Sequence, residues 1–297
     1  MKRETSMGHV EELVYAETDD GFLHAGVVIH PPDQAPAANA IVWVHGAGAN
    51  FYLRPYILLA RELAAHGVTS ILGNNRGHDF GFFVGFEGHR PVYAGQGWEY
   101  FEHAPRDIRA WTDFAERQGF GQVVLLGHSL GATKALYAQA QHGDERVRGL
   151  VLASAPARLQ KQSTLPAVLM RAQRMVRAGR GQDLLPWASL PGGGTLSAYT
   201  YLNRAQAHLD CFGLDRGEPL VRHITCPMLA FYGTNEEFMG TAHDLEYMQR
   251  NATNAPSVAL RMVDGADHTY TGHEREVAGM IAQWIKLLPE PSAEGSG

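Results

Sequence analysis

A five-residue motif at 127–131, with the sequence GHSLG, constrains this chain more than any other feature. The apolar run at 122–126 before it predicts a short buried strand, and residues 132–140 after it predict a helix. A G-x-S-x-G motif at a strand-to-helix turn is typical of a nucleophile elbow. The turn is so sharp that a larger side chain at its glycines would collide with neighbouring backbone. The motif therefore predicts that the Ser129 hydroxyl stands above the edge of a sheet.

The same turn would place the backbone N–H of Leu130 at the N-terminus of a helix. Free amides and the helix dipole stabilise negative charge there. An amide beside a serine nucleophile suits the oxyanion that forms when the serine attacks a carbonyl carbon. The motif therefore predicts acyl chemistry at Ser129.

Strand and helix signals alternate along the rest of the chain. We expect strands at 13–18, 22–30, 41–44, 68–72, 122–126, 147–153, 228–232 and 258–263, and helices at 55–66, 105–118, 132–140 and about 274–288. The first two strands flank Asp19, Asp20 and Gly21 and predict an antiparallel hairpin. The alternation predicts an α/β fold with a mostly parallel, eight-stranded sheet and helices on both faces.

One stretch interrupts this alternation: about 70 residues between the strands at 147–153 and 228–232 carry no strand signal. It contains an amphipathic run at 165–178 with apolar residues on one face. Long insertions in compact folds are usually functional. We therefore expect a helical cap at 157–225, inserted into a core domain formed by 10–156 and 226–289, with a flexible tail at 290–297.

Composition excludes several other classes of protein. The chain has 297 residues and a formal net charge of −6, so no overall basic field would attract nucleic acid. No apolar stretch reaches the roughly 20 residues that span a bilayer, and the charged N-terminus leads into no signal sequence. Cys211 and Cys226 are the only cysteines, which favours a reducing compartment. We expect a cytoplasmic protein whose partner is a small molecule, with its oligomeric state open.

The motifs together resemble one family. They are His45-Gly46-Ala47-Gly48, Asn75-Arg76-Gly77-His78-Asp79, the elbow at Ser129, Gly233-Thr234-Asn235-Glu236, and Ala266-Asp267-His268. From about 13 to 288 the chain resembles the α/β-hydrolase fold family. Within that family it is most similar to poorly characterised bacterial members with a helical cap, and more weakly to fungal siderophore esterases.

The resemblance implies a catalytic triad in the chain order nucleophile, acid, histidine. Ser129, Glu236 and His268 fit that order, with Glu237 as the alternative acid, although most members carry Asp at this position. Glu236 is preferred because it lies at the expected offset after Gly233. The resemblance also implies that the Ala47 N–H is the second oxyanion donor beside Leu130.

Several histidines compete for the role of base. His268 follows the expected strand at 258–263 through a short loop, which places it at the same sheet edge as Ser129. His273 is the runner-up, at the start of the closing helix. We interpret His45 as a structural residue of the oxyanion loop and His128 as packing beside the elbow.

Other signals are weaker. A dinucleotide-binding G-x-G-x-x-G motif starting at Gly46 would need glycine where Phe51 stands, and no P-loop is present, so we expect no cofactor. The polar residues between Asn203 and Cys211 match no metal site. Aromatic residues at 80–102 predict packing, with some lining an apolar pocket. The cationic residues of the cap form either a solvated face or a surface for an anionic substrate; they are Arg158, Lys161, Arg171, Arg174, Arg177 and Arg180.

The sequence thus favours a serine hydrolase that cleaves a carboxylic ester of a small or medium-sized molecule through an acyl-enzyme, without cofactor or metal. The same triad could cleave a thioester, a lactone, an amide or a carbon–carbon bond next to a ketone. A fold alone does not fix the chemistry. A catalytically silent, ligand-binding member is the alternative of another class, and the intact order of Ser129, Glu236 and His268 argues against it.

Overall fold

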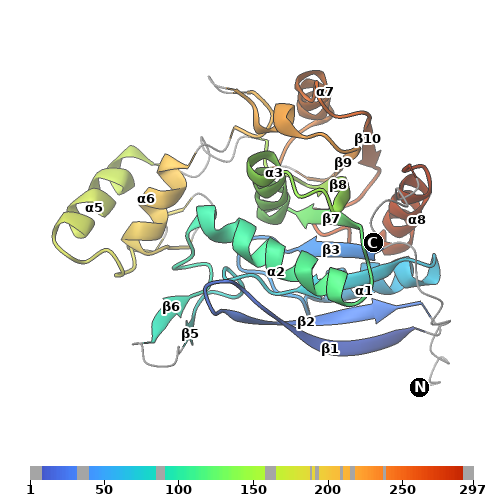
Figure 1. The fold of residues 1–297 in the computed structure, drawn as a ribbon. Coiled ribbons are helices and arrows are strands. Elements are labelled where there is room, and N and C mark those ends of the chain that lie inside the picture. The colour runs from blue at the N-terminus through green and yellow to red at the C-terminus, as the bar shows by residue number, and fades with distance from the viewer. Residues whose placement is uncertain are drawn as a thin grey trace.

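An eight-stranded sheet forms the centre of the protein (Figure 1). The computed structural model describes residues 9–31, 40–84, 91–157, 165–187, 189–190, 194–207, 210–214, 218–236 and 239–289. The strands are β1 (Val10–Glu17), β2 (Leu23–His30), β3 (Ala40–Val44), β4 (Thr69–Gly73), β7 (Val123–His128), β8 (Val147–Ala153), β9 (Met228–Gly233) and β10 (Val258–Val263). Their spatial order is β1-β2-β4-β3-β7-β8-β9-β10. The β1–β2 and β2–β4 pairs are antiparallel and the other pairs are parallel, which confirms the predicted sheet.

Helices cover both faces of this sheet. Helices α1 (Arg54–Ala65) and α8 (Glu274–Lys286) pack on one face, and α2 (Ala104–Arg117), α3 (Leu130–His142) and α7 (Ala242–Asn251) pack on the other. Side chains alternate between the two layers because successive residues of a strand point to opposite faces. In β7, Val124 and Leu126 join the core under α1 and α8, whereas Leu125 joins the core under α2 and α3.

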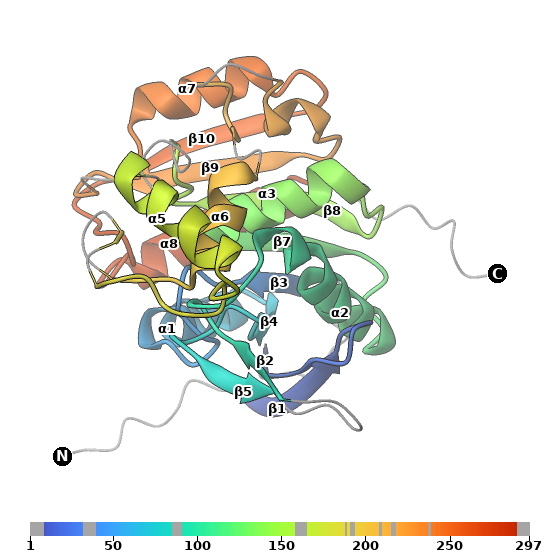
Figure 2. The same cartoon turned by 90° about the vertical axis from the view of Figure 1, so that its left-hand side faces the viewer.

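Two further helices, α5 (Pro166–Arg177) and α6 (Ala198–Gln206), lie beyond the carboxyl ends of the parallel strands (Figures 1 and 2). They follow β8 and precede β9 along the chain, and they share an apolar cluster that contains Ala172, Met175 and Tyr201. Their treatment as a separate cap domain stays a prediction. Arg158, Lys161 and the tail at 290–297 lie outside the described residues.

The α5–α6 unit, residues 165–187 and 194–207, rests on the segment 97–102. The Ser197 N–H donates to the Gly97 carbonyl at 2.8 Å. The Trp98 indole N–H donates to the Gln182 carbonyl at 2.9 Å. The Phe101 N–H donates to Asn203 Oδ1 at 2.7 Å. The segment 97–102 is therefore the platform on which α6 docks.

The aromatic segment at 80–102 contains short elements that the sequence analysis did not predict. It contains the antiparallel strands β5 (Phe82–Val84) and β6 (Val92–Ala94) and the short 3₁₀ helix η1 (Phe101–His103). Strands of three residues are too short to show an alternating pattern. Ring contacts support them instead, since Phe83 and Tyr93 have their ring centroids 4.4 Å apart. A second 3₁₀ helix, η2 (Leu220–His223), precedes β9.

The described helices include none with both the length and the apolar character that crossing a membrane requires.

Candidate active site

Ser129 occupies the sharp turn between β7 and α3 that the motif predicts. Its backbone has φ 54° and ψ −128°, a conformation that non-glycine residues seldom adopt. A Cβ added to Gly127 would lie 2.4 Å from Ala132 Cα, and one added to Gly131 would lie 2.0 Å from the Val44 carbonyl oxygen. Both flanking glycines are therefore required by close packing of the backbone.

The loop after β3 packs directly against this turn. A Cβ added to Gly46 would lie 3.1 Å from Ser129 Cβ, so the two backbones are in contact. The Ser129 N–H is already used, because it donates to the Ala153 carbonyl at 2.9 Å. Within the described part of the chain, the N–H groups of Ala47 and Leu130 have no acceptor. These two amides are thus available to an oxygen atom bound beside Ser129.

His45 fixes the Gly46 loop through hydrogen bonds of both its ring nitrogens. Its Nδ1 donates to the Gly46 carbonyl at 2.8 Å, and its Nε2 accepts from the Asn75 N–H at 3.0 Å. Burial, and then the charge of Lys134, lower the pKa of His45 to about 3. The ring is therefore neutral and its tautomer is fixed, in agreement with the structural role predicted for it.

Glu236 and His268 form a hydrogen-bonded pair. His268 Nδ1 lies 3.2 Å from Glu236 Oε2, with 1% of the Glu236 side chain exposed and 38% of the His268 side chain exposed. The second carboxylate oxygen, Oε1, accepts from the Gly233 N–H at 2.7 Å and from the Ser154 hydroxyl, which also bonds to the Tyr270 hydroxyl. A carboxylate held in this way fixes the proton on Nδ1 and leaves Nε2 free to accept another.

The other candidates have partners elsewhere or lie outside the description. The Asp244 carboxylate caps α7, accepting from the Thr241 N–H at 2.9 Å. His273 lies 3.2 Å from Glu276. Glu237 lies outside the described residues. Of the candidates, the described residues therefore bring Glu236 and His268 together. They show no hydrogen bond between Ser129 Oγ and His268. Bonds between a nucleophile and its base are often long in unliganded enzymes.

His128 does more than pack beside the elbow, which corrects the interpretation from sequence. Its Nδ1 accepts from the Tyr56 hydroxyl at 2.7 Å, and its Nε2 donates to the His268 carbonyl at 2.7 Å. Tyr56 in turn accepts from the Gly46 N–H at 3.3 Å. The ring thus joins the elbow, the Gly46 loop and the His268 loop. The sequence does show a polar ring at the end of a buried strand, which indicates that His128 needs hydrogen-bond partners. It does not show which ones, because they lie 72 and 140 residues away.

These two buried histidines predict a loss of stability in acid. Burial, and then the charge of His268, lower the pKa of His128 to about 4, and that of His45 is lower still. Below an ordinary histidine pKa of about 6.5 the unfolded chain binds protons that the folded chain excludes, so stability falls as the pH falls toward 4. We expect the free energy of unfolding to drop by up to about 1.4 kcal/mol per pH unit for each ring.

Urea unfolding at pH values of about 7, 6 and 5 measures this effect. His128→Asn should flatten the profile, whereas replacement of the exposed His142 by Asn should leave it unchanged. A free energy of unfolding that stays constant over this range would contradict the neutral, buried state of both rings.

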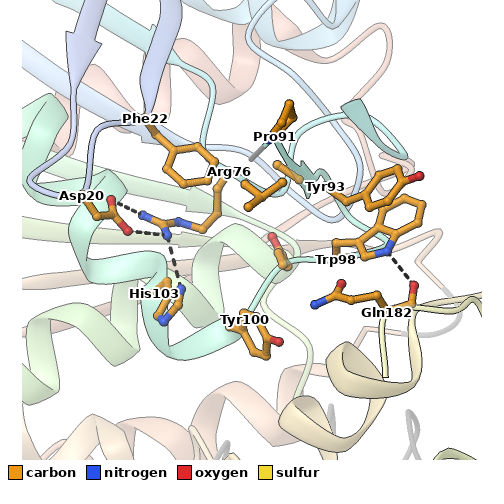
Figure 3. A pocket seen from close by; sticks show the side chains of 12 residues that line it. Asp20, Phe22, Arg76, Pro91, Tyr93, Trp98, Tyr100, His103 and Gln182 are labelled. Carbon is orange, nitrogen blue, oxygen red and sulfur yellow. Dashed lines mark hydrogen bonds and ion pairs between the residues drawn. The ribbon is translucent and has the colours of Figure 1, made fainter. Parts of the chain in front are cut away.

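A cavity of about 380 Å³ opens between the β1–β2 turn, the 91–100 segment and the end of η1 (Figure 3). Three aromatic residues of the 80–102 segment line it, Tyr93, Trp98 and Tyr100, together with Phe22. Aromatic residues of this segment thus do line a pocket, as predicted, but the pocket is not purely apolar, because Arg76, Asp20 and Glu99 also line it. Ser129 and His268 are not among its lining residues. The cavity is therefore mixed in character and is separate from the serine.

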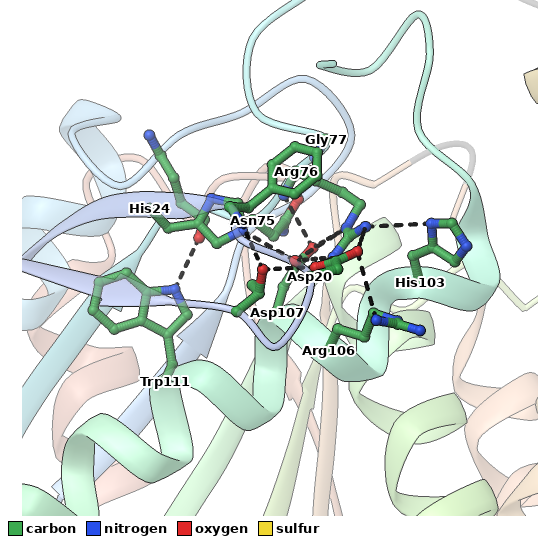
Figure 4. A network of polar contacts seen from close by, with 12 residues as sticks. Asp20, His24, Asn75, Arg76, Gly77, His103, Arg106, Asp107 and Trp111 are labelled. Carbon is green, nitrogen blue, oxygen red and sulfur yellow. Dashed lines mark hydrogen bonds and ion pairs between the residues drawn. The ribbon is translucent and has the colours of Figure 1, made fainter. Parts of the chain in front are cut away.

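The Arg76 side chain anchors the 75–79 loop to two other elements (Figure 4). Its guanidinium lies 2.9 Å from Asp107 Oδ1 and 3.0 Å from Asp20 Oδ2, and its backbone N–H donates to Asp107 at 3.0 Å. Burial alone would lower the pKa of Arg76, but the two carboxylates outweigh it and raise the pKa further above its ordinary value. All of these groups are engaged with one another, so the loop motif has a structural role here.

Metal ligands do not cluster among the described residues. Within the described part of the chain, no cluster of three or more histidine, cysteine, aspartate or glutamate side chains could hold a metal ion. His208, one of the polar residues weighed for a metal, lies outside it.

Similar solved structures share the fold of this chain. Est1E from Butyrivibrio proteoclasticus, with ferulic acid bound, superposes with a TM-score of 0.67 at 16% identity, covering 92% of this chain and 98% of that one. An esterase domain of a Rhodothermus marinus protein gives 0.62 at 17% identity, with 94% and 99% covered. An esterase from Pyrococcus furiosus gives 0.61 at 15% identity, with 94% and 91% covered.

No curated protein matches this chain in sequence. The family model described as alpha/beta hydrolase fold matches residues 39–201, which include the Gly46 loop and the elbow at Ser129. This match spans more than half of the sequence and agrees with the strand order of the sheet. The chain therefore belongs to the alpha/beta hydrolase fold family.

Proposed function

We propose that this protein is a serine hydrolase that cleaves a carboxylic ester of a small or medium-sized molecule through an acyl-enzyme. One observation carries the proposal: the buried Glu236 carboxylate is bonded to His268 Nδ1 at the sheet edge where Ser129 occupies its strained turn. Two of the similar structures are esterases and a third, Est1E, holds ferulic acid, a carboxylic acid; these likenesses support an ester as the substrate class.

In the proposed reaction, Ser129 Oγ attacks the ester carbonyl carbon and its proton moves to His268 Nε2. The carbonyl oxygen becomes an oxyanion that the Ala47 and Leu130 N–H groups stabilise. The C–O bond to the alcohol then breaks, and His268 gives its proton to the departing oxygen. Water, deprotonated by His268, attacks the acyl-enzyme, and the proton returns to Ser129 Oγ as the acid leaves.

Covalent labelling with a fluorophosphonate tests this proposal. An activated serine reacts with the probe, and we expect one adduct, located at Ser129 by mass spectrometry of the digested protein. A chain that takes up no probe would instead be a ligand-binding member of the family. A panel of esters, thioesters, lactones and amides, compared by kcat/KM, then ranks the bond types.

The α5–α6 unit is expected to select substrates while the sheet domain performs the chemistry. Met175 lies in the apolar cluster between the two helices, and Arg174 is exposed on α5, as are Arg171 and Arg177; Arg180, just after α5, is exposed too. Met175→Ala or Arg174→Ala should change the relative kcat/KM of short and long esters by about tenfold, the scale on which pocket contacts discriminate between substrates. Fluorophosphonate labelling of Ser129 should change less.

An exposed substitution on the sheet, Arg261→Ala, is the matched control and should alter neither quantity. If several substitutions in α5 leave the ester preference unchanged, the α5–α6 unit is a structural cover without a role in selection.

A further inference from the structure

A chain of polar contacts begins on helix α6 and enters the core of the sheet domain. Arg204 Nη2, on α6, lies 3.1 Å from Glu99 Oε1. The other oxygen of the same carboxylate, Oε2, accepts from Lys134 Nζ at 2.7 Å. Lys134 is on α3, the helix that begins directly after Ser129. One carboxylate from the 97–102 platform therefore links α6 to the helix that follows the nucleophile.

The chain of contacts continues to the loop beside Ser129. Lys134 Nζ also donates to Asn75 Oδ1 at 3.3 Å. The Asn75 N–H donates to His45 Nε2 at 3.0 Å, and His45 Nδ1 donates to the Gly46 carbonyl at 2.8 Å. Each step is a hydrogen bond or an ion pair between described residues. Arg204 is thereby connected to the loop that carries the Ala47 amide.

The three charged side chains Arg204, Glu99 and Lys134 are largely buried, so removal of one of them affects the other two. The Lys134 and Glu99 side chains are each 2% exposed, and Arg204 is 11% exposed. Burial alone would raise the pKa of Glu99, but Lys134 and then Arg204 outweigh it and lower that pKa. Removal of one partner of a buried ion pair is strongly destabilising, because it leaves a buried charge without compensation. In the absence of Arg204, Lys134 is the remaining cation beside Glu99, so we expect the bond from Lys134 Nζ to Asn75 Oδ1 to change.

A second contact runs from α6 to the elbow itself. Leu130, the proposed oxyanion donor, forms a buried apolar cluster with Phe101, and Tyr137 and Ala207, the C-cap residue of α6, pack against this cluster. The two proposed donors are therefore each supported by a route from α6. The route to Leu130 is apolar and short, and the route to Ala47 is the polar chain through Glu99.

We infer that Arg204 is a positioning residue: by docking α6 on Glu99 and Lys134, it holds the Gly46–Ala47 loop in the geometry that binds the oxyanion. This inference rests on the proposed function. It makes the α5–α6 unit a part of the apparatus that stabilises the oxyanion as well as a selector of substrates. A cap that worked only as a cover would have no influence on the amide of Ala47.

The two roles predict opposite effects on a small covalent probe. If α6 is only a cover, then loosening it opens the site and a small fluorophosphonate labels Ser129 faster. If Arg204 positions the oxyanion loop, then Arg204→Ala should lower the second-order rate constant of labelling by about tenfold, since complete loss of one oxyanion donor costs about 10² to 10³ in rate. Arg204→Lys keeps a cation opposite Glu99 and should recover most of the rate.

Hydrogen exchange gives a second measurement that does not depend on activity. In Arg204→Ala the amides of 45–49 should exchange several-fold faster than in the unaltered chain, together with those of α6. Arg177→Ala, an exposed arginine on α5, is the matched control and should leave both the labelling rate and the exchange of 45–49 unchanged. Glu99→Gln, which keeps the size of the side chain, should reproduce the Arg204→Ala result.

Labelling that is unchanged or faster in Arg204→Ala, with faster exchange confined to α6, would overturn the inference. Failure of the unaltered chain to label would count against the proposed function instead. The coupling between α6 and the Gly46 loop would then be decided by the exchange of 45–49 alone.

Discussion

Replacing Ser129 with alanine should abolish covalent labelling and lower ester hydrolysis by several orders of magnitude while the fold is kept. The variant lacks the oxygen that forms the acyl-enzyme, so only binding and the two oxyanion amides remain to assist attack by water. Alanine retains the Cβ, so the backbone at φ 54° is no more strained than before. The Ser129 hydroxyl has no hydrogen bond to another described residue, so its removal leaves no buried partner unsatisfied.

The measurement is kcat/KM for the best ester of the panel, with thermal unfolding of both proteins as the check on folding. Ser257→Ala, at an exposed position, is the control and should behave like the unaltered chain. Hydrolysis at the original rate in Ser129→Ala would overturn the assignment of the nucleophile and with it the acyl-enzyme route.

The sequence predicted those parts of the fold that depend on local patterns. Apolar runs located the central strands β3, β4, β7 and β9, because strands buried on both faces are apolar throughout. The edge strand β1 is mostly exposed, and it was located with β2 through the turn at 19–21. The elbow could be predicted because Gly127 and Gly131 are required by backbone contacts only 2.4 and 2.0 Å away from an added Cβ. The strands β5 and β6 could not, since three-residue segments carry no period and depend on ring contacts across the loop.

The contacts that support the candidate site were beyond prediction for a different reason. In the sequence, Lys134 is a single lysine in a predicted helix, and its burial against Glu99 becomes visible only when segments 35 residues apart are brought together. Arg204 and Glu99 are 105 residues apart. Pairings of this kind depend on tertiary packing, which no motif or local period encodes. The same holds for His128, whose hydrogen-bond partners are the Tyr56 hydroxyl on α1 and the His268 carbonyl.

The acid of the proposed triad can be tested by a change that preserves its size. Glu236→Gln should lower turnover by about four orders of magnitude, the cost that follows when the catalytic imidazole adopts the wrong tautomer. The contacts of Glu236 explain why this change is so severe. Its Oε1 accepts from the Gly233 N–H at 2.7 Å, so the amide oxygen of glutamine must occupy that position. The amide NH₂ then faces His268 Nδ1 and donates to it, which moves the ring proton to Nε2, the atom that must accept from Ser129.

Stability should change little, because glutamine fills the same buried space and keeps the bond to Gly233. Glu236→Asp, the acid that most members of the family carry, should lose less activity than Glu236→Gln if the loop can move slightly toward His268.

Glu237→Gln should be mild, since adjacent side chains leave the backbone in different directions. The opposite pattern would move the acid to Glu237. Two mild variants would require another carboxylate such as Asp244, which would first have to give up its bond to the Thr241 N–H and with it the cap of α7.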